Sequence, residues 1–188
     1  MGVHSMKDMP STPAKGLVFT KVWKREDPRD VLILRTAKHL SELREDAVIA
    51  TGSKRRAFQL LKLRPDLQII NIRGNVDTRL RKMEEQQLDG IVLAAAGLKR
   101  LGMEDVITQY LAPEDMISAP AQGALALEVR EDQKELQKML DVFCDEETMN
   151  EVCAERNFLE QMGGSCHTPA GARCQKTDQG YELYAMFG

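Results

Sequence analysis

A short stretch near the C-terminus, GGSCHTP at residues 163–169, places Cys166 among residues that favour a turn. Its glycines permit positive φ angles and its proline cannot continue a helix, so the sequence predicts a loop here. A cysteine on an exposed loop can carry a covalently attached group. The alternative is that Cys166 is structural and packs as a small apolar residue in a tight turn.

A base and an acid stand side by side near the N-terminus, in the sequence VHSMKDMP at residues 3–10. Asp8 is a candidate for stabilising a cation or directing a proton, and Lys7 for holding an anion beside it. The alternative is that Lys7 and Asp8 form a solvated ion pair, as adjacent lysine and aspartate residues beside a turn more often do.

Two further segments lie where a strand is expected to end and a helix to begin. Thr51-Gly52-Ser53 brings together backbone N–H groups, two hydroxyls and the positive end of a helix dipole, which favour an anion. Arg73-Gly74-Asn75 ends the next strand. Because the carboxyl ends of parallel strands lie along one edge of a sheet, we expect the two turns to border one crevice.

Arginines follow both turns. A guanidinium group binds a carboxylate through two hydrogen bonds of about 1.5 to 3 kcal/mol each, so this crevice would suit a polycarboxylate. The GxxxxGK[ST] pattern of nucleotide-binding loops does not occur here. The alternative is that the arginines lie on solvated helix faces. The arginines expected in the crevice are Arg55, Arg56, Arg73 and Arg79.

Alternating strands and helices over residues 31–113 position these side chains and predict an α/β unit with a parallel-rich sheet. From about Asp145, the pattern predicts a separate α+β unit that includes an edge strand at 180–187. Strands are expected at 17–22, 31–34, 48–50, 68–72, 90–95 and 124–130, and helices after Ser53 and at about 76–84, 132–142 and 146–162.

Composition narrows the function classes. The 188 residues are 43% hydrophobic with a net charge of -3, and no apolar run has transmembrane length, which predicts a cytoplasmic protein without a membrane partner. Four cysteines form no CxxC pair, and we expect no metal. Residues 54–82 hold nine basic and two acidic residues but one aromatic, so nucleic acid is a weak candidate for a partner.

Seven segments, in this order along the chain, resemble the porphobilinogen deaminase (hydroxymethylbilane synthase) family. Together they span essentially the whole sequence. The segments are VHSMKDMP at 3–10, REDPRD at 25–30, TGSKRR at 51–56, RGNV at 73–76, AAAGLKRL at 94–101, PAQGA at 120–124, and ER at 155–156 leading to Cys166.

The resemblance implies a transferase of tetrapyrrole (haem) biosynthesis that condenses four porphobilinogen molecules into hydroxymethylbilane and releases ammonia. It implies that Cys166 holds a dipyrromethane cofactor through a thioether and that Asp8 is the catalytic aspartate. It further implies that Gln122 and Gly123 line the cleft. The residues that it assigns to acetate and propionate side chains are Ser5, Lys7, Thr51, Ser53, Arg55, Arg56, Arg73 and Arg79.

The resemblance also implies three domains, the first two like periplasmic binding proteins with the cleft between them. Residues 1–24 and 118–142 would be parts of an incomplete first domain, 25–117 a complete second domain and 143–188 part of an α+β third. Gly52 stands where the family commonly has serine, and Ala170 where it has a larger apolar residue.

Because the chain would begin inside the first domain, we expect poor turnover from this chain alone. One alternative is an inactive carboxylate-binding remnant. The other is one half of a split enzyme that a second chain complements, although the family is typically monomeric.

Overall fold

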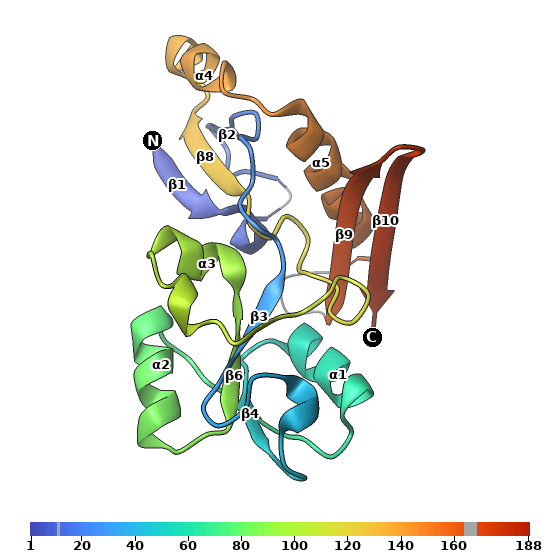
Figure 1. The fold of residues 1–188 in the computed structure, drawn as a ribbon. Helices are drawn as coiled ribbons and strands as arrows, with labels where there is room; N and C mark the ends of the chain where they lie inside the picture. Colours follow the sequence, from blue (N-terminus) through green and yellow to red (C-terminus); the bar gives the residue numbers. More distant parts are fainter. Residues whose placement is uncertain (11, 164–168) are drawn as a thin grey trace.

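The computed structural model describes residues 1–10, 12–163 and 169–188, and their strands form three separate sheets (Figure 1). The first sheet is antiparallel, in the order β1-β8-β2. The third is an antiparallel hairpin of two strands. The strands of these two sheets are β1 (Gly2–Ser5), β2 (Leu17–Phe19), β8 (Leu125–Arg130), β9 (Ala170–Thr177) and β10 (Gly180–Phe187).

The second sheet has five strands in the order β5-β4-β6-β3-β7. Strand β4 pairs in parallel with β5 and β6, whereas β3 is antiparallel to β6 and β7. The predicted α/β class is therefore confirmed, with a mixed sheet in which the parallel pairs surround β4. The strands are β3 (Asp30–Leu34), β4 (Val48–Ala50), β5 (Gln68–Ile70), β6 (Gly90–Ala94) and β7 (Gln109–Tyr110).

Helices cover both faces of the five-stranded sheet. Successive side chains of a strand point to opposite faces, so the apolar residues of β3 contribute to a core on each face. Leu32 packs in one core with Leu60 of α1 (Lys54–Leu63), and Val31 packs in the other with Met83 of α2 (Val76–Glu85). The short α3 (Ala95–Arg100) joins the second core. Figure 1 shows α1 and α2 on opposite sides of the sheet.

Two helices follow β8 and lead to the hairpin. They are α4 (Lys134–Asp141) and α5 (Glu146–Gln161). Asp145 caps the start of α5, and its carboxylate accepts a hydrogen bond from the backbone N–H of Thr148 at 2.8 Å. Three single 3-10 turns complete the fold: η1 (Met6–Asp8), η2 (Leu40–Glu42) and η3 (Glu104–Val106). Within the described ranges, no helix is both long and apolar enough to span a membrane.

The three sheets fall inside the three domain ranges that the sequence predicts, and the division itself stays a prediction. Two segments connect the first sheet to the second, and they contact each other where the N–H of Glu26 donates to the carbonyl of Gly123 at 3.1 Å. Gly123 has a φ of 87°, and a Cβ there would lie 2.2 Å from the Glu26 carbonyl oxygen. This crossing therefore requires glycine at position 123.

Gly123→Ala should lower the free energy of unfolding by at least about 2 kcal/mol, because the side chain adds a left-handed backbone penalty to a backbone clash. Urea titration measures the change. Gly97→Ala is the matched control: its Cβ meets no atom within 4 Å in α3, so we expect a gain of about 0.4 to 1 kcal/mol. Equal stability of the two variants would contradict the close approach of the Gly123 and Glu26 backbones.

Candidate functional site

An open cleft of about 730 Å³ lies between the η1 turn that follows β1, the carboxyl edge of the second sheet and α5. Of the described residues that line it, six are basic and one, Asp8, is acidic. It therefore favours anions. The lining residues include Lys7 and Asp8 of η1, Thr51, Ser53, Lys54, Arg55 and Arg56 after β4, Arg73 and Arg79 after β5, Gln122, Leu159 of α5 and Ala170 of β9.

Nine of the twelve predicted site residues line this cleft; the exceptions are Ser5, Gly123 and Cys166. Ser5 pairs with Leu125 in the β1–β8 ladder. Gly123 was expected beside Gln122 on the cleft wall, but it packs against the backbone of Glu26 instead. Cys166 lies outside the described residues.

The turn between β4 and α1 presents a helix N-terminus to the cleft. The hydroxyl oxygen of Ser53 accepts from the backbone N–H of Arg56 at 3.4 Å, and that of Thr51 accepts from Ser53 at 3.2 Å. Each hydroxyl keeps its proton for donation to an anion. A Cβ at Gly52 would lie 3.0 Å from the Ile72 carbonyl oxygen, so glycine lets the two turns approach closely.

A buried aspartate that the sequence analysis did not single out anchors the arginine pair. Asp30 begins β3 and is fully buried. Its Oδ1 accepts from Nε and Nη2 of Arg56 at 3.0 and 2.7 Å, and its Oδ2 lies 2.7 Å from Nη1 of Arg55. Burial alone raises the pKa of Asp30, but the charges of Arg55 and Arg56 outweigh it and hold the pKa well below its usual range.

The opposite wall carries Lys7 and Asp8. Burial, together with the charge of Arg56, lowers the pKa of the Lys7 amine to about 8, and this amine donates to Oε1 of Gln122 at 3.2 Å. The turn is held from α5, where Arg156 donates to the carbonyls of Met6 at 3.1 Å and Pro10 at 2.6 Å. Asp8 itself is exposed.

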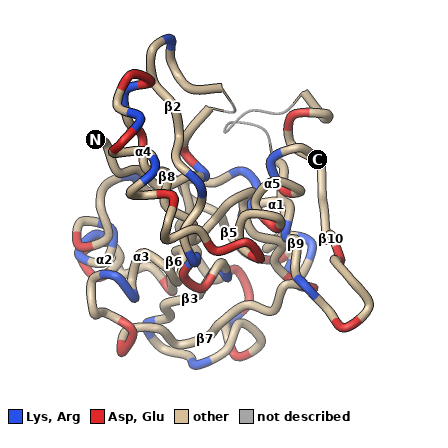
Figure 2. The backbone as a smooth tube through the Cα atoms, turned by 90° about the horizontal axis from the view of Figure 1, so that it is seen from above, with Lys and Arg blue, Asp and Glu red and all other residues tan. Residues whose placement is uncertain are grey.

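The second turn adds two arginines of different character. Arg79 is half-buried and its Nε donates to the Gly74 carbonyl at 2.7 Å, while burial and the nearby Arg56 lower its pKa. Arg73 is exposed. Basic and acidic segments alternate along the backbone, α2 included, so the basic stretch 54–82 is no uniformly positive face (Figure 2). Its positive charge gathers where its arginines enter the cleft.

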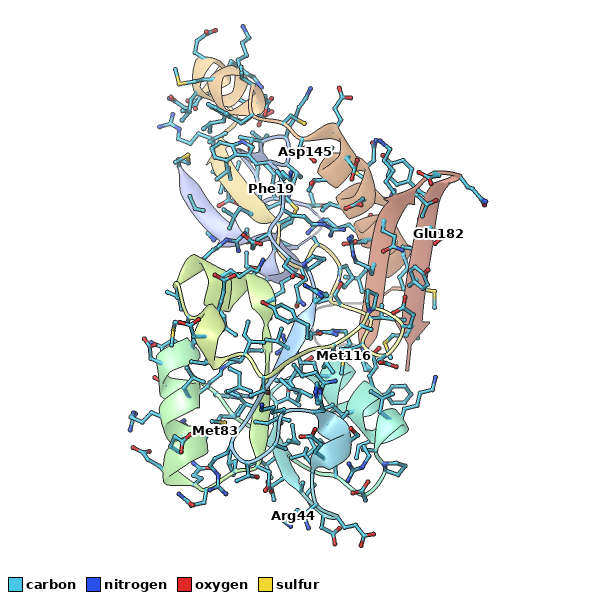
Figure 3. The ribbon with its side chains drawn as sticks, viewed as in Figure 1. Phe19, Arg44, Met83, Met116, Asp145 and Glu182 are labelled. Atoms are coloured by element: carbon cyan, nitrogen blue, oxygen red, sulfur yellow. The ribbon has the colours of Figure 1, made fainter. Side chains whose placement is uncertain are left out.

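A buried ion network ties α5 and β9 to the cleft wall. The carboxylate of Glu155 accepts from the backbone N–H groups of Ala121 at 2.7 Å and Cys174 at 2.8 Å. Arg25 donates to both of its oxygens. Met116, labelled in Figure 3, packs in one core with Leu32 of β3. Among the residues with described positions, no group of three His, Cys, Asp or Glu could hold a metal.

Residues 1–138 match the family model described as "Porphobilinogen deaminase, dipyromethane cofactor binding domain". The chain belongs to this family. Porphobilinogen deaminases from three organisms are 50 to 56% identical to it: Lachnospira eligens (56%, covering 100% of this chain and 65% of the relative), Clostridioides difficile (50%, 100% and 63%) and Bacillus subtilis (52%, 90% and 54%).

The chain thus spans about three fifths of the length of the porphobilinogen deaminases it matches. Among solved structures, a periplasmic binding protein of Salmonella typhimurium with high arginine specificity aligns with 83% of the chain and 68% of its own, at 14% identity and a TM-score of 0.40.

Proposed function

We propose that this chain provides the catalytic cleft of a porphobilinogen deaminase, which joins four porphobilinogen molecules head to tail and releases ammonia to form hydroxymethylbilane. The observation that carries the proposal is the cleft, in which a lysine–aspartate turn faces an arginine pair. We assign residues 1–24 and 118–142 to a first domain, 25–117 to a second and 143–188 to a third.

The basic wall would hold the carboxylates of the pyrroles. Arg79 and the more exposed Arg73 keep guanidinium donors for a bidentate carboxylate contact. Arg55 and Arg56 are 4% and 6% exposed and already share Asp30, so they would supply mainly a fixed positive field. Thr51 and Ser53 would add hydroxyl donors beside the N-terminus of α1.

Asp8 would act on the charge that develops during condensation. The C–N bond of the protonated aminomethyl group breaks and ammonia leaves with the bonding electrons, so the positive charge passes to the pyrrole. The free α-carbon of a second pyrrole forms the new C–C bond and then loses its proton. A carboxylate placed beside the cation would stabilise the transition state. Arg156 holds the backbone on both sides of Asp8 through the Met6 and Pro10 carbonyls.

The cleft also fits a tethered dipyrromethane. Its carboxylates match the basic lining, and Leu159 and Ala170, on either side of residues 164–168 in sequence, both line the cleft. Cys166 is the one cysteine in that stretch and would be the point of attachment. When bound, the cofactor supplies the primer that the condensation extends.

The affinity of the chain for porphobilinogen should fall as the pH rises above about 8. Below about pH 8 the Lys7 amine is charged. Above about pH 8 the amine is neutral and must take up a proton before it can pair with a carboxylate. The charged groups around this amine are Arg56, Asp30, Asp8 and Arg55. Calorimetry should show a loss of up to about tenfold per pH unit. Lys7→Met should remove this slope, and an unchanged slope would contradict the role of Lys7.

Incubation with porphobilinogen tests the proposal directly. We expect binding and ammonia release, with tetrapyrrole formed slowly by this chain alone. Binding without any ammonia release would favour the alternative of a carboxylate-binding protein. Absence of binding would contradict the proposed substrate.

A further inference from the structure

We propose that Gln122 is a positioning residue that joins the two walls of the cleft, setting Lys7 on one wall and the Asp30 anchor of the arginines on the other. This inference deepens the proposed function and rests on it. It goes beyond the role that the family resemblance implies for Gln122, which is to line the cleft.

The side chain of Gln122 is 1% exposed and its amide is already engaged. Nε2 donates to the Pro28 carbonyl at 2.7 Å and to Oδ1 of Asp30 at 3.0 Å. Oε1 accepts from the amine of Lys7 at 3.2 Å. Both amide protons and one of two lone pairs are therefore used within the protein, which leaves little capacity for a ligand.

These partners require an amide at position 122. The Nε2 end faces a carbonyl and a carboxylate, which accept, while the Oε1 end faces an ammonium group, which donates. The reverse orientation would place donor against donor and acceptor against acceptor. A carboxylate in its place could serve Lys7 but would repel Asp30.

Contacts on both sides of Gln122 fix the backbone conformation that orients its side chain. Ala121 and Gly123 both have positive φ, 61° and 87°, a conformation that costs free energy for alanine. Glu155 supports Ala121 by accepting its N–H, and Arg100 donates to the Gly123 carbonyl at 2.6 Å. Gln122 is thus fixed on both sides by contacts from separate elements.

The hydrogen bonds also connect two sheets. Lys7 follows β1 of the first sheet, whereas Asp30 begins β3 of the second. Gln122, on a segment between the sheets, bonds to both. Gln122 therefore contributes directly to the distance between the amine of Lys7 and the arginine pair, and with it to the spacing of carboxylates that the cleft accepts.

A double-mutant cycle distinguishes positioning from direct contact. Porphobilinogen dissociation constants are measured for the wild-type chain, Gln122→Met, Lys7→Met and the double variant. Gln122→Met should weaken binding about tenfold or more, because it removes hydrogen bonds to charged groups. In the Lys7→Met background the loss should be at least about threefold smaller. Equal losses in both backgrounds would show direct ligand contact and overturn the proposal.

Gln109→Met is the matched control, because Gln109 also uses its side chain within the fold, accepting from the Leu40 N–H at 2.7 Å on the edge strand β7. We expect its porphobilinogen affinity to stay within about twofold of wild type, whatever its stability. A loss equal to that of Gln122→Met would mean that the effect is general destabilisation, and would overturn the proposal.

A ligand-free measurement separates this inference from the proposed function. The titration midpoint of the Lys7 amine, followed by NMR of labelled lysine, should move by more than about half a pH unit in Gln122→Met. It should stay at about 8 in Gln109→Met. If the midpoint moves while porphobilinogen fails to bind the wild type, the proposed function fails and the positioning role stands. An unchanged midpoint overturns the positioning role.

Discussion

Asp30→Asn should lower the free energy of unfolding by about 3 to 5 kcal/mol, the cost of breaking a buried ion pair by removing one partner. Asp30 is fully buried and neutralises Arg55 and Arg56, which are themselves nearly buried. Asparagine keeps the shape but loses the charge and turns an amide donor towards one guanidinium group. Two cations then remain in the core of the cleft wall with no counter-charge.

Urea titration measures the loss, and Asp66→Asn is the matched control. Asp66 also pairs with an arginine, Arg64, at 2.6 Å, but both side chains are partly exposed to solvent. Surface pairs contribute little, so the control should stay close to wild type. If Asp30→Asn were as stable as Asp66→Asn, the arginine pair would not depend on its buried counter-charge.

Asp8→Asn should slow ammonia release from porphobilinogen about 100- to 1,000-fold, the usual effect of removing one preorganised group that stabilises transition-state charge. Asp8 is exposed on a turn, so its loss should leave the fold intact. The dissociation constant of porphobilinogen should change little, because the carboxylate acts on charge that exists only after the C–N bond begins to break.

Asp77→Asn provides the control for this comparison, since Asp77 is exposed in the first turn of α2 and does not line the cleft. Its rate should match wild type. A raised KM at unchanged kcat in Asp8→Asn would assign the carboxylate to substrate binding rather than to the developing cation. Equal rates for the two variants would remove Asp8 from the catalytic machinery.

Local signals made much of the fold predictable. The helices α1, α2 and α5 begin after Ser53, Asn75 and Asp145, and each of these side chains accepts a hydrogen bond from a backbone N–H of its helix. The strand at 180–187 was predicted with its observed bounds. In contrast, the strand expected at 90–95 ends at Ala94, where α3 begins within an unbroken apolar run that shows no boundary.

Other elements depend on partners far away in the sequence. The strands β1, β7 and β9 were not predicted. Of these, β1 pairs with β8 and β9 pairs with β10. The strand expected at 17–22 forms a ladder only to Phe19. Tertiary pairing therefore decides these elements, which are short or carry polar residues that weaken the pattern.

The positive charge of the cleft was predictable from the sequence, but the buried contacts that hold its arginines were not. The turns after β4 and β5 share one edge because those strands are parallel, and this brings the four predicted arginines to one cleft. The burial of Arg56 was not predictable, because its partner Asp30 is 26 residues away. An acid that opens a run of buried apolar residues is the signal that could have revealed Asp30.

The intact mass of the chain after incubation with porphobilinogen tests the central claim, that a pyrrole primer attaches at Cys166 and reaches the cleft. We expect an added mass of two pyrrole units that Cys166→Ser abolishes. Cys153→Ser, which alters an exposed cysteine on α5, should leave the adduct in place. No added mass on the wild-type chain, or an adduct that survives in Cys166→Ser, would contradict it.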